Sequence, residues 1–185
     1  MLEAEERDFS ARLRDGLARV DAAVTELESA VGTADIWVCD LERKLRTRFT
    51  FDPTNDWYPA WSPDGKVLAY TSDASGNDDI WLHLVESGAA VRVTPGPDYE
   101  SEASWSPDGS KIAFTALDEN GRTRVFIRRL DAGTAHALSG TEGAQYPFWA
   151  PDSRWLGFFT QPDDVLRKID TNGGPPITLC PASNG

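Results

Sequence analysis

The sequence has few cysteines and histidines and no long apolar run, so it offers little with which to build a cysteine–histidine metal centre, a disulfide framework or a membrane span. Only 2 of its 185 residues are cysteines, Cys39 and Cys180, and they form neither a Cys-x-x-Cys motif nor a metal-binding spacing. Because they lie in distant parts of the chain, we expect two small thiols rather than a disulfide, with no metal and no cofactor. No stretch approaches the roughly 18 apolar residues of a membrane helix, so membrane insertion is not expected.

Basic residues are also scarce relative to acidic ones. The chain has 18 Lys and Arg against 30 Asp and Glu, a net charge of −12, which disfavours nucleic acid as a partner. The one basic stretch, 43–48, lies between two strand-like segments and is interpreted as a solvated hairpin. The first residues are acidic where a signal peptide would be basic, which predicts a cytoplasmic chain as written. A piece of a longer secreted or membrane-anchored protein would instead be extracytoplasmic.

Catalytic motifs are missing as well. There is no Gly-x-Ser-x-Gly nucleophile elbow, no glycine-rich nucleotide loop, no His-Arg-Asp and no Asp-Phe-Gly. The only two histidines, His83 and His136, lie in or beside expected outer strands and are interpreted as surface residues. The acidic segment 73–79 lacks the full spacing of a calcium loop and is interpreted as a polar hairpin. We therefore expect no enzymatic activity from the chain.

The first 32 residues are typical of a helix. Residues 3–31 contain no proline and a single glycine, Gly16, and their apolar side chains recur every three or four positions. These apolar residues are Phe9, Leu13, Leu17, Val20, Val24, Leu27 and Val31. The spacing predicts an amphipathic α-helix over 1–32 that packs on its own domain, dimerises or caps the domain that follows.

A repeat of 44 residues begins after this segment. Its most visible part is a Trp-Ser/Ala-Pro-Asp segment in three copies, with tryptophans at Trp61, Trp105 and Trp149. The aspartates of the same segments are Asp64, Asp108 and Asp152. An earlier half copy begins at Asp35, which is 44 residues before Asp79.

Each repeat holds four short strand candidates separated by turns, such as Ser-Pro-Asp-Gly, whose residues suit tight turns. We expect strands over 35–40, 45–50, 58–62, 66–72, 79–85, 90–94, 102–106, 110–116, 124–130, 135–139, 146–150, 154–160, 165–170 and 176–180. A period of about 40–45 residues with four strands per repeat is typical of β-propeller blades. The prediction is an all-β, partial β-propeller of about three and a half four-stranded blades over 33–185, preceded by the N-terminal α-helix.

The repeated residues have structural interpretations. A propeller blade has two apolar faces, so neighbouring blades must stack and large side chains must fill the joints between them. Trp61, Trp105 and Trp149 are accordingly predicted to be inter-blade core residues. Asp64, Asp108 and Asp152 are predicted to organise turns.

The Trp-Ser-Pro-Asp-Gly segment followed by Asp79-Ile80-Trp81 resembles the repeats of TolB-like propellers, which are relatives of the WD repeat. The resemblance covers residues 34–185. The third copy, from Tyr146 to Trp155 and on through Gly173-Gly174-Pro175-Pro176, looks like the sensor propellers of bacterial serine/threonine kinases. Because the kinase motifs are missing, the resemblance implies a propeller with a binding role in signalling and does not imply kinase activity.

Candidate binding residues precede each expected inner strand, where a propeller opens its central channel. They are Asp56, Trp57 and Tyr58 in one copy, Glu100, Ser101 and Glu102 in the next, and Gln145 and Tyr146 in the third. Aromatic residues mixed with carboxylates suit a protein or peptide partner, and the family resemblance implies use of the same mouth. We expect a non-catalytic scaffold or sensor. The alternative is an accessory propeller of an enzyme, such as a serine/threonine kinase or a propeller-bearing peptidase.

Three and a half blades are fewer than the four to eight of usual propellers, so the chain looks like a piece of a longer ring. An incomplete ring leaves apolar blade faces open, and such faces promote self-association. At the C-terminal side we expect the exposed face to carry Trp149, Leu156 and Phe158.

Overall fold

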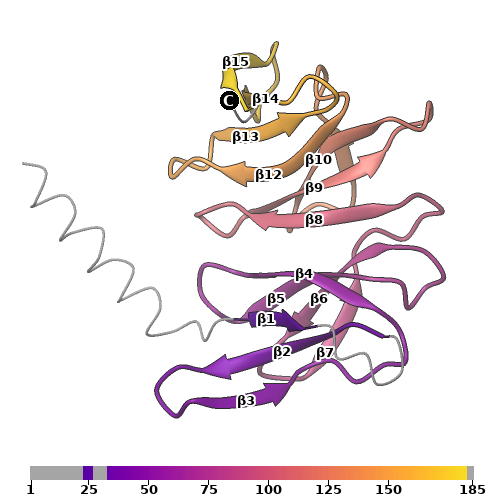
Figure 1. Cartoon of the computed structure of the whole chain (residues 1–185), viewed down its shortest axis with the longest axis vertical. Coiled ribbons are helices and arrows are strands. Elements are labelled where there is room, and N and C mark those ends of the chain that lie inside the picture. Colours follow the sequence, from indigo (N-terminus) through magenta and orange to yellow (C-terminus); the bar gives the residue numbers. More distant parts are fainter. Residues whose placement is uncertain (1–22, 27–32, 183–185) are drawn as a thin grey trace, which may run out of the picture.

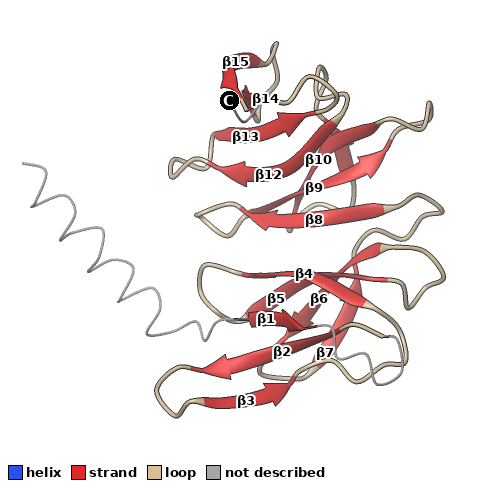
Figure 2. Cartoon of the chain, viewed as in Figure 1, coloured by secondary structure: helices blue, strands red, loops and turns tan. Residues whose placement is uncertain are grey.

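Four β-sheets stacked one after another make up the described part of the protein. The computed structural model describes residues 23–26 and 33–182, and within them it contains fifteen strands in one three-stranded and three four-stranded sheets. The sheets follow the chain order, from the indigo sheet of the first strands to the C-terminal sheet, which runs from orange to yellow (Figure 1). In these ranges every regular element is a strand (Figure 2).

The strands have the following bounds. They are β1 (Ala23–Glu26), β2 (Asp35–Asp40), β3 (Leu45–Arg48), β4 (Asp56–Trp61), β5 (Val67–Ser72), β6 (Asp79–Leu84), β7 (Ala89–Arg92), β8 (Glu100–Trp105), β9 (Lys111–Leu117), β10 (Thr123–Arg129), β11 (Ala135–Ala137), β12 (Ala144–Trp149), β13 (Trp155–Thr160), β14 (Val165–Asp170) and β15 (Ile177–Pro181).

Each four-stranded sheet is an antiparallel meander, as the repeat predicts. The sheets are ordered β4-β5-β6-β7, β8-β9-β10-β11 and β12-β13-β14-β15, so sequence neighbours are also hydrogen-bonded neighbours. All strands expected from the repeat are present, and none of their ends differs from the prediction by more than two residues. We call these sheets the first, second and third blades.

The N-terminal helix prediction is wrong for Ala23–Glu26. These residues form β1, which pairs antiparallel with β2. The repeat aligns β2 with β6, so β1 lies where β5 lies in the first blade. Hydrogen bonding to the otherwise unpaired edge of β2 outweighs the local helical spacing, because tertiary pairing overrides weak propensities. The rest of the predicted helix, 1–22 and 27–32, lies outside the described residues.

The apolar core lies in the joints between sheets. Ile36 of β2 packs with Leu68 and Tyr70 of the first blade, and Trp61 packs against this cluster. The joint between the first and second blades contains Trp105, which is 9% exposed. The joint between the second and third blades contains Ala113, Val125, Leu138, Leu156 and Phe158, with Trp149 packed against it. Each repeat tryptophan therefore lies at a joint.

The expectation that Leu156 and Phe158 would be exposed is wrong. Both side chains are fully buried, because their face of β13 packs against the second blade rather than away from it. Strand residues alternate between faces, so the opposite face carries Gly157 and Phe159. The ring of Phe148 lies across Gly157, where an added Cβ would come within 2.3 Å of it.

Candidate functional site

The inner strand of each blade carries the same irregularity. Hydrogen-bonded pairing with the second strand shifts register between Trp57 and Ala60 in β4, with equivalent shifts in β8 and β12. Such a shift is a β-bulge, which bends a strand and redirects its side chains. The inner strands also begin two residues earlier than predicted. The candidate binding residues therefore lie within strands, at or next to the bulges, and not in the loops before them.

The bulges hold three non-glycine residues in the left-handed region of backbone space. Their φ angles are 50° at Tyr58, 59° at Glu102 and 52° at Tyr146. A side chain in this region costs of order 1 kcal/mol or more, and such strain concentrates at functional sites. Two of the three precede a proline, Pro59 or Pro147, which lacks the N–H needed for the strand ladder and so favours a bulge there. At these two bulges the sequence contains a local reason for the irregularity, whereas Glu102 precedes Ala103 and has none of this kind.

The three bulges line one open groove with a volume of about 420 Å³. Aromatic side chains dominate its surface, since Tyr58 is 52% exposed, Tyr146 is 57% exposed and Phe148 is 45% exposed. Its lining residues are Tyr58, Pro59, Glu102, Ala103, Ser104, Tyr146, Pro147, Phe148 and Phe159. Exposed aromatic residues of this size are unusual on a surface that has no partner.

Glu102 is the charged residue in this lining. Its carboxylate accepts a hydrogen bond of 2.7 Å from the backbone N–H of Tyr146 and one of 3.2 Å from the Thr115 hydroxyl. The first of these bonds joins the second blade to the third. Glu102 is therefore held in place between two tyrosines, as a fixed acceptor and negative charge on an aromatic surface.

The remaining candidates do not line the groove. Trp57, Ser101 and Gln145 are half-buried and pair with the second strand of their blade. Asp56 is 2% exposed and Glu100 is 7% exposed. The structure thus brings together Tyr58, Glu102 and Tyr146 and separates them from the other five candidates.

The two buried acids share an electrostatic feature. One carboxylate oxygen of Asp56 and one of Glu100 have no hydrogen-bond partner among the described residues. Burial raises the pKa of Asp56, and burial together with the nearby Asp79 raises the pKa of Glu100 to about 7. The third blade has Ala144 at this position, so the buried acid is not repeated there.

Sequence reasoning missed Phe148 and Phe159 of the groove. Phe148 occupies the repeat position that holds the small residues Ala60 and Ser104 in the other copies. This change from a small to a large aromatic residue is the feature of the sequence that could have identified it. Phe159 lies on β13 beside it, with ring centroids 6.4 Å apart. Both residues extend the aromatic surface beyond the tyrosines.

The repeated tryptophans and aspartates serve the scaffold. The indole N–H of Trp105 donates to the carbonyl of Ala60 over 2.9 Å, and Trp149 donates to Ser104 over 3.0 Å. Each tryptophan thus anchors its blade to the preceding one. Asp64, Asp108 and Asp152 accept backbone N–H bonds two residues ahead, from Lys66, Ser110 and Arg154. They organise turns.

Several other chemistries have no support in the described residues. Within 23–26 and 33–182, no group of three or more His, Cys, Asp or Glu side chains is placed to hold a metal ion. In the same ranges, no helix is long and apolar enough to cross a membrane. Cys39 and Cys180 are free thiols. The His83 ring lies tilted against the ring of Phe49, with centroids 4.4 Å apart, and burial lowers the pKa of His83.

Comparison with known families agrees with the propeller blades. The family model described as the TolB beta propeller domain matches residues 22–184. The chain belongs to this family. The match begins next to β1 and ends beyond β15, so the three-stranded sheet belongs to the TolB-like propeller as well as the three complete blades. No curated protein sequence matches the chain.

Solved structures share the TolB-like fold. TolB from Acinetobacter baumannii is 23% identical with a TM-score of 0.70, and the match covers 86% of this chain and 40% of that one. An oligogalacturonate lyase in complex with manganese is 15% identical with a TM-score of 0.70, covering 88% and 50%. A chain of a nidogen/laminin complex is 15% identical with a TM-score of 0.62, covering 78% and 57%. This chain therefore spans 40–57% of the length of these proteins.

Proposed function

We propose that this TolB-like propeller is a non-catalytic module that binds a protein or peptide segment in the groove of Tyr58, Glu102 and Tyr146. The observation that carries the proposal is the alignment of three bulges, which turn three strained residues into one surface. Holding them there costs free energy that the surrounding fold must offset, and residues strained in this way cluster at binding and active sites.

The groove has the chemistry of a recognition surface. Tyrosine and phenylalanine provide large apolar area at a small entropy cost and are enriched at the centres of protein interfaces. Glu102 adds a fixed acceptor for a backbone N–H or a basic side chain of the partner. We therefore expect the ligand to be a short extended segment with at least one apolar side chain and one donor group that faces Glu102.

Structures of the same fold support a binding role and also supply the alternative. One of them is part of a complex of nidogen with laminin, in which a chain of this fold occurs with a protein partner. Another is an oligogalacturonate lyase, so the fold also occurs in an enzyme. The second candidate is accordingly an accessory propeller that serves an enzyme such as a serine/threonine kinase or a propeller-bearing peptidase. A kinase or peptidase reading frame adjacent to this gene would favour it.

The test is selection of peptides from a displayed library on the wild-type chain, followed by affinity measurements by fluorescence anisotropy. A double variant, Tyr58→Ala with Tyr146→Ala, should bind the selected peptides at least about tenfold more weakly, because it removes both aromatic contacts. Tyr99→Ala is the matched control, since Tyr99 is 56% exposed and lies outside the groove lining. Peptides that bind the double variant and the wild type equally would contradict the proposal.

A further inference from the structure

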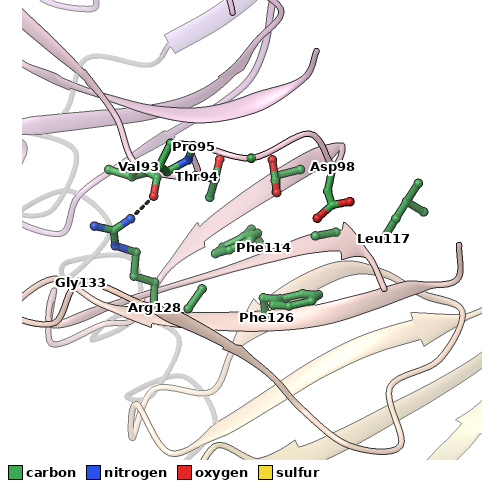
Figure 3. Close-up of a pocket in the computed structure, with 13 residues that line it drawn as sticks. Val93, Thr94, Pro95, Asp98, Phe114, Leu117, Phe126, Arg128 and Gly133 are labelled. Atoms are coloured by element: carbon green, nitrogen blue, oxygen red, sulfur yellow. Dashed lines mark hydrogen bonds between the residues drawn. The ribbon is translucent and has the colours of Figure 1, made fainter. Parts of the chain in front are cut away.

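A second pocket, distinct from the groove, lies at the joint between the first and second blades (Figure 3). Its volume is about 320 Å³. One wall is the loop that leads from β7 to β8, and the other wall comes from β9, β10 and the start of β11. None of the residues predicted from the sequence to bind a partner lines it except Glu100.

The pocket exists because the side chains at this joint are smaller than those at the preceding joint. At the preceding joint, the repeat positions are filled by Phe49 and Trp81, and Phe49 packs against the rings of Trp61 and His83. In the next repeat, Phe49 is replaced by Val93 and Trp81 by Phe126. Two smaller side chains at facing positions leave space that neighbouring residues do not fill.

Glu100 is a buried carboxylate in the lining of this pocket. It is 7% exposed, and its Oε2 atom has no hydrogen-bond partner among the described residues. The charged groups around it are Asp79 of β6, Asp98 of the loop and Arg92 of β7. A terminal N–H group of Arg92 donates to Asp79 over 2.7 Å and to the carbonyl of Gly96 over 3.0 Å, and its Nε has no hydrogen-bond partner among the described residues. The Thr94 hydroxyl also interacts with the Glu100 carboxyl group, but the Oε2 atom is left without a donor. A buried acceptor without a donor is costly, and a donor brought by a ligand would remove that cost.

Apart from Thr94, the rest of the pocket is apolar between a charged residue at each end. Phe114 and Phe126 lie stacked, with ring centroids 5.8 Å apart and an interplanar angle of 15°. Figure 3 shows them between Asp98 at one end and Arg128 at the other. The Arg128 guanidinium is turned away and donates to the carbonyl of Val93. A cation is therefore favoured at the Asp98 end, and an aliphatic chain is favoured over the two rings.

We propose that this pocket binds an alkylammonium group, from a lysine side chain or from a free aliphatic amine. The ammonium donates to Glu100 and Asp98, and its carbon chain packs on Phe114 and Phe126. An ammonium has three N–H donors around a compact charge, so one ligand atom satisfies both carboxylates. The first joint has Asp56 at the Glu100 position but is filled by aromatic residues, and the third blade has Ala144, so the site is particular to this joint.

The test uses the whole chain and butylammonium as the probe, followed by NMR of isotope-labelled protein. Saturable shifts should cluster on residues 93–98, 114–117 and 126–128. The uncharged analogue, 1-butanol, should bind at least about tenfold more weakly, because it cannot replace the charge-assisted hydrogen bonds. Affinity for butylammonium should rise between about pH 5.5 and pH 8.5 as Glu100 ionises, well below the ammonium pKa of about 10.4.

Variants separate the site from general charge attraction. Glu100→Gln should weaken butylammonium binding at least about tenfold and flatten its pH dependence. Glu119→Gln, an exposed acid on the β9–β10 turn, should leave both unchanged. If Glu100→Gln fails to fold, Asp98→Asn at the exposed end of the pocket takes its place. Equal binding of 1-butanol and butylammonium, or equal binding by the wild type and Glu100→Gln, would overturn the proposal.

The two sources of the ammonium are distinguished by N-acetyl-lysine-N-methylamide. If it binds as well as butylammonium, the pocket takes a lysine side chain from a peptide. If only butylammonium binds, the pocket takes a free amine. Because the groove variants leave this pocket intact, peptide binding in the groove and amine binding here succeed or fail independently.

Discussion

Truncation of Trp105 tests whether the repeat tryptophan holds two blades together. Trp105→Ala removes a large side chain that is 9% exposed between the first and second blades, together with its 2.9 Å hydrogen bond to the carbonyl of Ala60. Loss of a buried aromatic side chain of this size costs roughly 3–5 kcal/mol. For a domain of this length each kcal/mol lowers the Tm by about 2–4 °C, so we expect a loss of roughly 6–20 °C.

Phenylalanine substitutions separate packing from hydrogen bonding. Trp105→Phe keeps a ring but leaves the Ala60 carbonyl without its donor, which should cost about 1–2 kcal/mol beyond the lost contacts. The indole N–H of Trp61 has no hydrogen-bond partner among the described residues, so Trp61→Phe loses no such bond. In urea and thermal unfolding, Trp105→Ala should therefore be the least stable variant, Trp105→Phe should be more stable, and Trp61→Phe should be the most stable of the three. A Tm shift of only a degree or two for Trp105→Ala would refute the assignment of this residue to a joint.

Three further predictions follow from the buried acid, the first sheet and the absent catalytic motifs. The raised pKa of Glu100, about 7, means that its contribution to stability is present below about pH 4.5 and is lost as the pH rises through 7. The free energy of unfolding of Glu100→Gln, measured in urea titrations, should therefore rise by about 1–3 kcal/mol relative to that of the wild type as the pH increases from about 5 to 8.5. A difference in stability between the two proteins that does not change with pH would contradict this prediction. Deletion of 1–31 removes β1 and bares an edge of β2, so it should promote aggregation in light scattering, whereas deletion of 1–22 keeps β1 and should not. If both truncated chains are equally monodisperse, β1 does not protect the edge of β2 from aggregation. Purified chain should not turn over ATP, peptides or glycosides, and activity that survives repurification would disprove a non-catalytic role.

The blades were predictable because their information is periodic. A 44-residue spacing of tryptophans, together with turn residues at fixed offsets, places every strand from β2 onward within two residues. Such a pattern depends on local turn chemistry and on the alternation of strand residues, both of which are readable in one sequence.

Features that depend on neighbouring elements were not predictable in the same way. Residues 23–26 have helical spacing and become a strand only because β2 offers an edge. The polar Asp56 and Glu100 suggest loops, yet they begin inner strands because facing blades enclose them. Tyr58, Glu102 and Tyr146 could be chosen as candidates from their repeat positions, but their common bulge depends on pairing with the second strand. The pocket at Glu100 arises from a volume difference between two joints, which appears only when the blades are stacked.

The ring of Phe148 over Gly157 has a consequence for enlarging the protein by duplication. At the two preceding joints the corresponding cross-strand pairs, Ala60 with Ala69 and Ser104 with Ala113, are small, and the next tryptophan bonds to the carbonyl of the first member. In the third blade the corresponding pair is Phe148 with Gly157, and the phenyl ring covers the surface on which the next tryptophan would pack. If an extra copy of the repeat were inserted after the first or second blade, its tryptophan could pack on a small cross-strand pair and bond to the carbonyl there. If the same copy were placed after the third blade, its tryptophan would clash with the Phe148 ring. Exchange of Phe148 for serine and Gly157 for alanine would be needed before the series could grow in that direction.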